Sequence, residues 1–279
     1  MKPGKLFVVA TPIGNLGDIS HRALQVLGSV QLVAAEDTRH SQRLLSHYGI
    51  NVKLSSLHEH NEESKSPVLV ERMVQGDDIA LVSDAGTPLI SDPGRRLIKA
   101  AITADIKVIP VPGACAAIAA LSASGLSSDS FLFIGFLPAR GARRRKRLAQ
   151  LKFATPTLIF YEAVHRIEDF LQDIVEVFGE DRQAVVAREL TKQFESFQRG
   201  SLQELKMHYQ HHADQVRGEF VVLVEGVSSE VSQMTLDAEK VLQHLLEVLS
   251  PAKAAATASK ITGEAKSSLY ELAMKLKSN

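Results

Sequence analysis

Short apolar runs alternate with amphipathic segments along the first part of the chain. The runs are rich in valine and isoleucine, which is typical of buried strands, and helical patterns separate them. Strands joined by crossover helices form a mostly parallel sheet. The predicted strands are Leu6–Ala10, Gln31–Ala35, Val52–Leu57, Ile79–Ser83 and Lys107–Pro110. The predicted helices are Ser20–Leu27, Ser41–Tyr48, Pro67–Gln75, Pro93–Ala104 and Ala114–Ser124, with Ser66 and Asp92 as caps of the two that begin at proline.

The alternation resumes near Phe131 and predicts a second α/β lobe. The polar stretch between Arg188 and Gly200 alternates like an exposed strand, so we expect a mixed sheet here. The predicted strands are Phe131–Phe136, Thr157–Tyr161, Ala184–Arg188 and Glu219–Val224. The predicted helices are Ala142–Lys152, Val164–Phe178 and Leu202–Ala213.

A third pattern follows the second lobe. Residues 227–233 have the composition of a linker, and beyond them alanine, lysine and leucine dominate. Three short helices are predicted at Leu236–Leu249, Pro251–Lys260 and Ala265–Lys277, and the turn that contains Gly263 makes them similar to a helix-turn-helix unit. We therefore expect lobes at residues 1–113 and 114–227 and a helical domain at 235–279.

Composition narrows the class of protein. The 279 residues are 45% hydrophobic and 23% charged, with one cysteine, which excludes an internal disulfide and a cysteine-rich zinc site. No apolar run approaches the roughly 20 residues that span a bilayer, and the amino-terminal apolar run is too short for a signal peptide. A cytoplasmic protein without a membrane segment is expected.

Loops of small and acidic residues follow four of the predicted strands. The chain has no GxGxxG after the first strand, no GKS or GKT and no GxSxG, so dinucleotide, P-loop and serine-hydrolase chemistry lack support. The loops are instead ATPIGNLGDIS, AEDTR, SDAGTPLISDPG and VPGACAA, which begin at residues 10, 35, 83 and 111. They should converge at the carboxyl edge of the sheet, and the aspartates favour a cationic ligand over a phosphate.

The loops together resemble those of the tetrapyrrole methylase superfamily of S-adenosylmethionine-dependent enzymes. With FYEAVHR and ARELTK from the second lobe, the set is most similar to the branch that 2′-O-methylates a cytidine ribose in the decoding region of 16S rRNA. The resemblance covers Leu6 to Gly226, and the helical tail matches the helix-turn-helix unit of that branch. It implies a two-lobed tetrapyrrole-methylase-like α/β fold, S-adenosyl-L-methionine as cofactor, the small ribosomal subunit or its 16S rRNA as partner, and a homodimer.

The resemblance also implies the cofactor contacts. They fall on the loops of the first lobe and on the FYEAVHR and ARELTK motifs of the second, and many of them would be backbone contacts. The residues are Pro12, Ile13, Ser83, Asp84, Ala85, Pro88, Cys115, Ala116, Tyr161, Glu162 and Leu190. The chain has SDAG where the tetrapyrrole enzymes carry a glycine-glycine-aspartate run, so Asp84 is displaced by one position.

The catalytic base is a separate question, because methyl transfer to a ribose hydroxyl requires removal of a proton from a poor acid. Glu36 matches an acidic catalytic residue of the tetrapyrrole branch, although Glu36 and Asp37 together also suit the end of a strand and a helix cap. Lys192 would serve as a base only if burial lowered its pKa, and would otherwise contact phosphate. His58 and His60 share a strand face, but no third ligand follows at a suitable spacing, so we expect no metal site.

A basic segment stands out from the neutral chain. Residues 130–161 contain no acidic residue, and six of the eight residues 140–147 are cations. Arg140, Arg143, Arg144 and Arg147 have helical spacing on one face, which favours contact with an RNA backbone over a solvated face. The function that the resemblance implies, and with which a basic face agrees, is rRNA ribose 2′-O-methylation. A tetrapyrrole C-methyltransferase and a non-catalytic ribosome assembly factor remain the alternatives.

Overall fold

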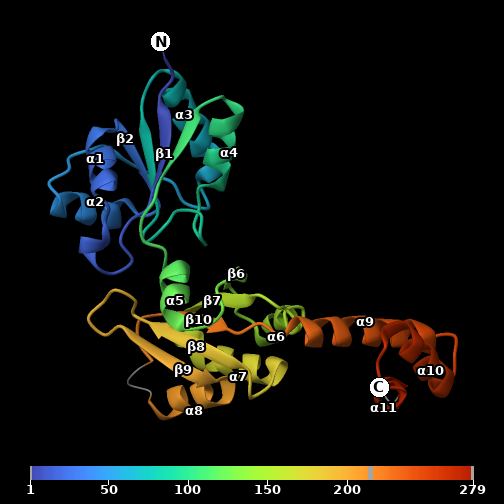
Figure 1. Cartoon of the computed structure of the whole chain (residues 1–279). Coiled ribbons are helices and arrows are strands. Elements are labelled where there is room, and N and C mark those ends of the chain that lie inside the picture. Colours follow the sequence, from blue (N-terminus) through green and yellow to red (C-terminus); the bar gives the residue numbers. More distant parts are fainter. Residues whose placement is uncertain (1, 213–215, 278–279) are drawn as a thin grey trace.

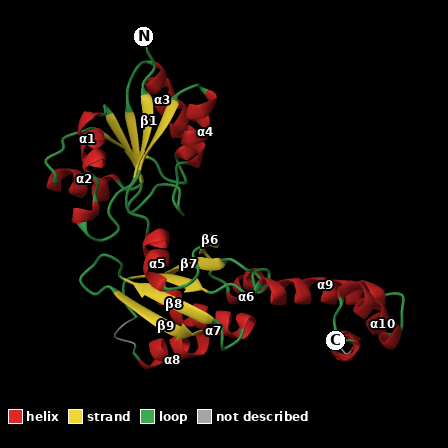
Figure 2. Ribbon diagram, viewed as in Figure 1, coloured by secondary structure: helices red, strands yellow, loops and turns green. Residues whose placement is uncertain are grey.

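The computed structural model describes residues 2–212 and 216–277, and it has two α/β lobes with a helical tail that extends away from them (Figures 1 and 2). Among these residues no helix is both long and apolar enough to cross a membrane. The two lobes follow one another in the chain and meet where the loop after β5 enters α5.

A parallel sheet with the strand order β3-β2-β4-β1-β5 forms the centre of the first lobe. Its strands are β1 (Lys5–Val9), β2 (Leu32–Ala35), β3 (Leu54–Ser56), β4 (Ile79–Val82) and β5 (Lys107–Val111). Helices α1 (His21–Ser29) and α2 (Thr38–His47) cover one face of this sheet. Helices α3 (Glu62–Val74) and α4 (Arg95–Thr103) cover the other face. Both faces are thus buried, which explains the continuous apolar runs in the sequence.

The second lobe contains a mixed sheet with the order β6-β7-β10-β8-β9, in which only β6 and β7 pair in parallel. Helix α5 (Ala116–Ser124) packs on one face, and α6 (Gly141–Ala149), α7 (Ile167–Phe178) and α8 (Leu202–His211) belong to the other. Side chains of β7 alternate between the two faces, as strand geometry requires. The strands are β6 (Phe131–Phe136), β7 (Thr157–Ala163), β8 (Gln183–Arg188), β9 (Ser196–Ser201) and β10 (Glu219–Val224).

The tail consists of α9 (Ser229–Leu246), α10 (Pro251–Thr262) and α11 (Lys266–Lys277). These helices pack around a small alanine-rich core of their own that includes Leu242, Ala255 and Leu269. Gly263 ends α10 with a φ of 79°, a left-handed conformation that glycine adopts readily. The separate cores and the packing of α5 on the second sheet are the grounds on which we propose domain limits at residues 113 and 227. The expected start of the helical domain at residue 235 falls inside α9.

The fold class is as predicted, but three local predictions are wrong. Helix α3 begins at Glu62, so Ser66 lies inside it and donates a hydrogen bond of 2.6 Å to the carbonyl of Glu62. Helix α4 begins after Gly94 without a side-chain cap from its own segment. Its amides donate instead to the Glu62 carboxylate, from Arg96 at 2.5 Å and Leu97 at 3.3 Å, because α3 packs beside α4. Helix α9 begins at Ser229, inside the segment expected to be a linker.

Candidate active site

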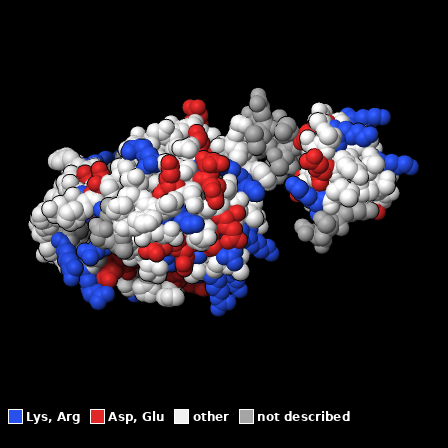
Figure 3. Space-filling model, turned by 90° about the horizontal axis from the view of Figure 1, so that it is seen from below, with Lys and Arg blue, Asp and Glu red and all other residues white. Residues whose placement is uncertain are grey.

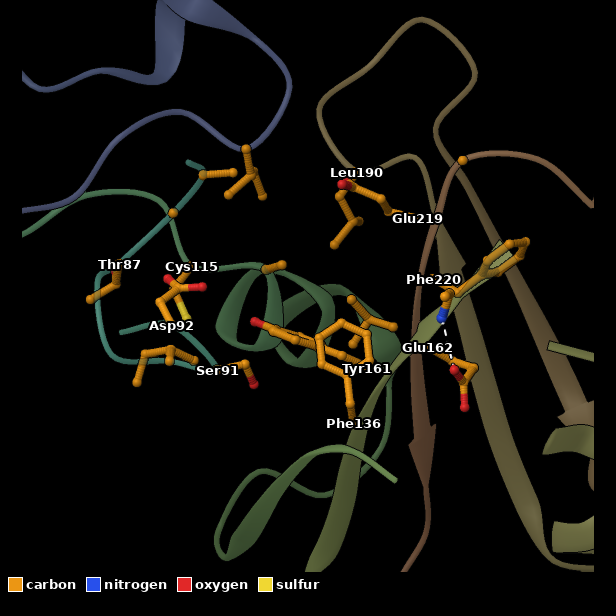
Figure 4. Close-up of a pocket in the computed structure, with 18 of the residues that line it drawn as sticks. Thr87, Ser91, Asp92, Cys115, Phe136, Tyr161, Glu162, Leu190, Glu219 and Phe220 are labelled. Atoms are coloured by element: carbon orange, nitrogen blue, oxygen red, sulfur yellow. Dashed lines mark hydrogen bonds between the residues drawn. The ribbon is translucent and has the colours of Figure 1, made fainter. Parts of the chain in front are cut away.

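A cavity of about 380 Å³ lies between the two lobes (Figure 4). The first lobe contributes Ile13 and the loop from Ala85 to Asp92, and the start of α5 contributes Cys115 and Ala116. The second lobe contributes aromatic rings, the Leu190 loop and the start of β10. Its volume is within the range of small-molecule sites, and such sites commonly form between domains.

Carboxylates give this first cavity its charge. Asp92, Glu162 and Glu219 line it, and none of its lining residues in the described part of the chain is a lysine, arginine or histidine. Burial, opposed by a hydrogen bond from Ser83 and reinforced by the charge of Asp84, raises the pKa of Asp92 to about 6. Burial also raises the pKa of Glu162, despite the amide of Ala163 at 2.8 Å. Glu162 and Glu219 are each paired with a cation behind the cavity wall, Arg166 and Lys192, both at 3.1 Å. The carboxyl of Asp92 is therefore the group through which the cavity favours a cation over a phosphate.

Tyr161 forms the floor of the cavity, between α5 and β6 (Figure 4). Its hydroxyl accepts a hydrogen bond of 3.0 Å from the amide of Ala117, in the first turn of α5. Its ring lies edge-on to Phe133 and Phe136, with centroids 5.0 and 5.7 Å away. Burial raises the pKa of Tyr161 well above its usual range, so the hydroxyl stays neutral and holds its position.

The loop after β4 is held in a strained conformation. Leu89 and Ser91 both have a φ of 74°, which is unusual for residues with a Cβ. Gly86 exchanges backbone hydrogen bonds of 2.9 and 3.1 Å with Thr11, and the hydroxyl of Thr87 donates to the carbonyl of Ala114 at 2.9 Å. Strain of this kind concentrates at functional sites, where surrounding contacts fix the backbone.

Lys192 lies opposite this loop, in the segment after β8. Its ammonium contacts the carboxylates of Glu189 at 2.8 Å and Glu219 at 3.1 Å. Burial acts to lower the pKa of Lys192, but the two carboxylates outweigh burial and raise it. A raised pKa does not favour Lys192 as a general base, so its part in catalysis stays a prediction, with a phosphate contact as the other role open to an ammonium.

A second cavity of about 300 Å³ adjoins the first and has a different chemistry. The two share Ile13, Ala85 and Glu219 as lining residues. The second cavity contains the basic side chains His40, Arg43 and Lys192 beside the carboxylates of Asp84 and Glu219. Its remaining walls are the β1–α1 loop and Leu44.

The structure gathers most of the residues expected to contact the cofactor. Those that line the first cavity are Ile13, Ala85, Cys115, Ala116, Tyr161, Glu162 and Leu190. Pro12 and Asp84 line the second cavity instead, whereas Ser83 and Pro88 are buried and line neither. Glu36 also lines neither cavity. Burial, followed by the charges of Asp84 and Asp92, raises the pKa of Glu36.

Several site residues were not found from the sequence. Phe136 and Glu219 stand at ends of strands, but their position at this edge depends on the strand directions, and β10 runs antiparallel to its neighbours. His40 and Arg43 lie on α2, whose helical pattern was recognised without a ligand-facing side. Asp92 was noticed for its charge and assigned to a helix cap.

The α6 segment corrects one prediction. Arg144 is 3% exposed, and its Nε donates to the Asp173 carboxylate on α7 at 2.6 Å. It therefore does not belong to an exposed basic face, and Arg145 pairs with the same carboxylate at 2.7 Å. Arg140, Arg143 and Arg147 are exposed, and we refer to these three as the α6 arginines. Figure 3 shows that acidic and basic side chains are interspersed on the face seen from below and that basic side chains also occur on the tail.

His58 and His60 are close together but do not form part of a larger cluster. Their rings lie edge-on with centroids 6.1 Å apart, and the side-chain amide nitrogen of Asn61 is 3.1 Å from Nε2 of His58. Among the described residues, no group of three histidine, cysteine, aspartate or glutamate side chains is arranged to hold a metal ion.

Solved structures resemble the chain at low sequence identity. The methyltransferase CobJ superposes with a TM-score of 0.60 at 18% identity, over 81% of this chain and 95% of its own. Uroporphyrin-III-C-methyltransferase from Thermus thermophilus gives a TM-score of 0.56 at 19% identity, over 80% and 94%. At such identities the likeness shows the fold, and it agrees with the two lobes seen here.

Sequence comparisons identify the family. A family model described as Tetrapyrrole (Corrin/Porphyrin) Methylases matches residues 5–206, and one described as RsmI C-terminal HTH domain matches residues 232–277. A Pseudomonas aeruginosa protein named Ribosomal RNA small subunit methyltransferase I is 53% identical over 98% of both chains. One of the same name from Escherichia coli O157:H7 is 49% identical over 97% of this chain and 95% of its own. The chain belongs to the tetrapyrrole methylase family, in the branch of the ribosomal RNA small subunit methyltransferases I.

Proposed function

We propose that this protein is an rRNA methyltransferase that uses S-adenosyl-L-methionine to 2′-O-methylate a cytidine ribose in the decoding region of 16S rRNA. The observation that carries the proposal is the first cavity, which lies between the lobes and is lined by carboxylates without a basic residue in the described chain. Relatives at about 50% identity that are named rRNA small subunit methyltransferases support the substrate class. An rRNA substrate supports a cytoplasmic location.

The residues of the first cavity fit this cofactor. A sulfonium carries a positive charge, which carboxylates and aromatic faces attract. Asp92 and Glu219 supply carboxylates, and Phe136 and Tyr161 supply rings. When bound, S-adenosyl-L-methionine supplies a methyl group that its sulfonium activates. We propose that the predicted contacts that line this cavity hold the cofactor. They are Ile13, Ala85, Cys115, Ala116, Tyr161, Glu162 and Leu190.

The protein's own residues have to orient the ribose hydroxyl and accept its proton. Glu36 remains our proposed base, and its raised pKa brings it closer to the neutral range in which a general base works best. Asp84 interacts with Glu36 and lines the second cavity.

The α6 arginines are our proposed contact with the RNA backbone. They are exposed, and they remain a single-signed face after Arg144 is removed from the set. Lys192 is protonated, which suits it to a phosphate contact. The homodimer is also a proposal, supported by the exposed apolar side chains Phe131 and Leu132 on the edge strand β6, and the solution mass tests it.

The test is methyl transfer to purified 30S particles from a strain that lacks this activity. With radiolabelled S-adenosyl-L-methionine, the label should enter 16S rRNA at one cytidine whose 3′ bond resists alkaline hydrolysis, as a 2′-O-methyl group requires. Label on a tetrapyrrole instead of RNA would establish the C-methyltransferase alternative. If equilibrium dialysis detects no binding of the cofactor, the assembly-factor alternative replaces the enzyme.

A further inference from the structure

The two cavities differ in the charged side chains that line them. Carboxylates are the only charged groups among the described residues of the first, whereas the second has three basic side chains beside the carboxylates of Asp84 and Glu219. The cavities touch along Ile13, Ala85 and Glu219. A cationic group in the first and an anionic group in the second would thus lie side by side across this shared wall, whose carboxylate, Glu219, pairs with Lys192 at 3.1 Å. Such a side-by-side placement is the arrangement that transfer between two ligands needs.

One side of α2 faces the second cavity. His40, Arg43 and Leu44 occupy positions i, i+3 and i+4 of that helix, so they share one side of it. Leu44, with Pro12 and Leu16 opposite, offers apolar surface to a base or sugar. The cavity therefore combines a cationic rim with apolar walls, which matches the two parts of a nucleotide.

Arg43 differs from the basic residues around it. Arg39, one turn before it, pairs with Asp37 at 2.8 Å, and Lys192 across the cavity pairs with Glu189 and Glu219. Arg43 is exposed and has no carboxylate partner among the described residues. A guanidinium without a partner that borders a cavity is available for a phosphodiester, which it can bind with two parallel hydrogen bonds.

The walls around Arg43 are held in place by hydrogen bonds. The Tyr48 hydroxyl at the end of α2 donates to the carbonyl of Leu16 at 2.6 Å, which ties α2 to the β1–α1 loop. The amide of Asp37 donates to the Asp84 carboxylate at 2.9 Å, which ties the start of α2 to the β4 loop. A cavity fixed in this way loses little entropy when a ligand binds.

We propose that the second cavity binds the ribonucleotide that accepts the methyl group, with Arg43 as the anchor of its phosphodiester. The inference rests on the proposed function and deepens it, since it assigns the acceptor subsite of the same active site. Asp84, on the wall of this cavity, is then the carboxylate that faces the ribose, and Glu36 acts beside it.

The experiment compares Arg43→Ala and Arg43→Lys with Arg22→Ala, an exposed arginine on α1 that lines neither cavity. We expect Arg43→Ala to raise KM for 30S particles about tenfold, with kcat at saturation and the Kd for S-adenosyl-L-methionine unchanged, because one good phosphate contact is lost. Arg43→Lys should recover part of the loss, and Arg22→Ala should behave as wild type. An unchanged KM in Arg43→Ala overturns the inference.

A binding measurement separates this inference from the proposed function. The probe is a fluorescent RNA oligonucleotide with the decoding-region sequence, titrated at several salt concentrations. Arg43→Ala should bind it about tenfold more weakly, and the slope of log affinity against log salt should fall by about 0.7, as expected for one lost phosphate contact. If wild-type protein transfers no methyl group to ribose, the proposed function fails. In that case the binding measurement by itself still tests whether the second cavity is an RNA subsite. Equal affinity of wild type and Arg43→Ala for the oligonucleotide overturns that inference.

Discussion

Replacing Asp92 with asparagine should stabilise the folded protein at neutral pH and weaken binding of the cofactor. The Asp92 carboxyl is partly buried, and burial raises its pKa from 3.8 to about 6. The folded protein therefore disfavours the ionised form that prevails at pH 7. Asparagine has nearly the same shape and no charge, so the variant avoids this penalty and retains a partner for the Ser83 hydroxyl.

The size and pH range of the effect follow from this pKa. A rise in pKa from 3.8 to about 6 corresponds to a destabilisation of at most about 3 kcal/mol, since a pKa difference of one between the folded and unfolded states is worth about 1.36 kcal/mol. The carboxyl is partly exposed, and screening by solvent reduces the expected gain to about 1 kcal/mol. Because the pKa is raised, the wild-type protein loses stability as the pH rises from 3.8 through about 6. The gain of Asp92→Asn should be full above pH 6 and vanish near pH 4.

Urea unfolding between pH 4.5 and pH 7.5 measures this gain, with Asp129→Asn as a control at an exposed aspartate. Isothermal titration at pH 7.5 should show about tenfold weaker binding of S-adenosyl-L-methionine, since a charge interaction of about 1.4 kcal/mol is lost. If Asp92→Asn is no more stable than wild type at pH 7.5, or its gain does not change with pH, the reasoning about buried charge is refuted.

Three further predictions concern the core, the RNA face and the base. Arg144→Met should lower the free energy of unfolding by about 3 kcal/mol in urea titrations because Asp173 loses one of its two partners, whereas Arg143→Met should change it by less than about 0.5 kcal/mol. Reversing the charge of the α6 arginines should weaken RNA binding and reduce its salt slope by about 2, with cofactor affinity unchanged; an unchanged slope would remove them from the RNA contact. Glu36→Gln should slow methyl transfer at least about 100-fold while cofactor binding persists. If Glu36→Gln keeps full activity and Asp84→Asn loses it, Asp84 is the base instead.

The regular elements were predictable because their burial is periodic. The strands of the first lobe are buried on both faces, so their sequences are continuous apolar runs. Successive side chains of β7 point alternately into two different hydrophobic cores, one on each face of the second sheet. The loops of small and acidic residues marked the edge of the sheet at which the first cavity lies. Their charge already favoured a cation over a phosphate, and Asp92 from one of these loops lines the first cavity, which has no basic lining residue in the described part of the chain.

Contacts between distant residues could not be predicted in the same way. Glu62 caps α4 across 34 residues, and Arg144 meets Asp173 across 29 residues. A helical pattern indicates which side of a helix is polar, but it does not indicate which other element packs there. For the same reason, Arg144 was assigned to an exposed face on spacing alone.

By itself, the sequence determined the α/β lobes, the helical tail and the acidic character of the first cavity, because these depend on local periodicity and on residue type. Only the tertiary structure decided which acids and bases act together. Strand order and helix packing bring Glu219 to the first cavity, pair Lys192 with two carboxylates and leave Arg43 unpaired beside the second cavity in the described chain. The chemistry of a charged side chain depends on its burial and its neighbours, and both are fixed only when distant segments meet.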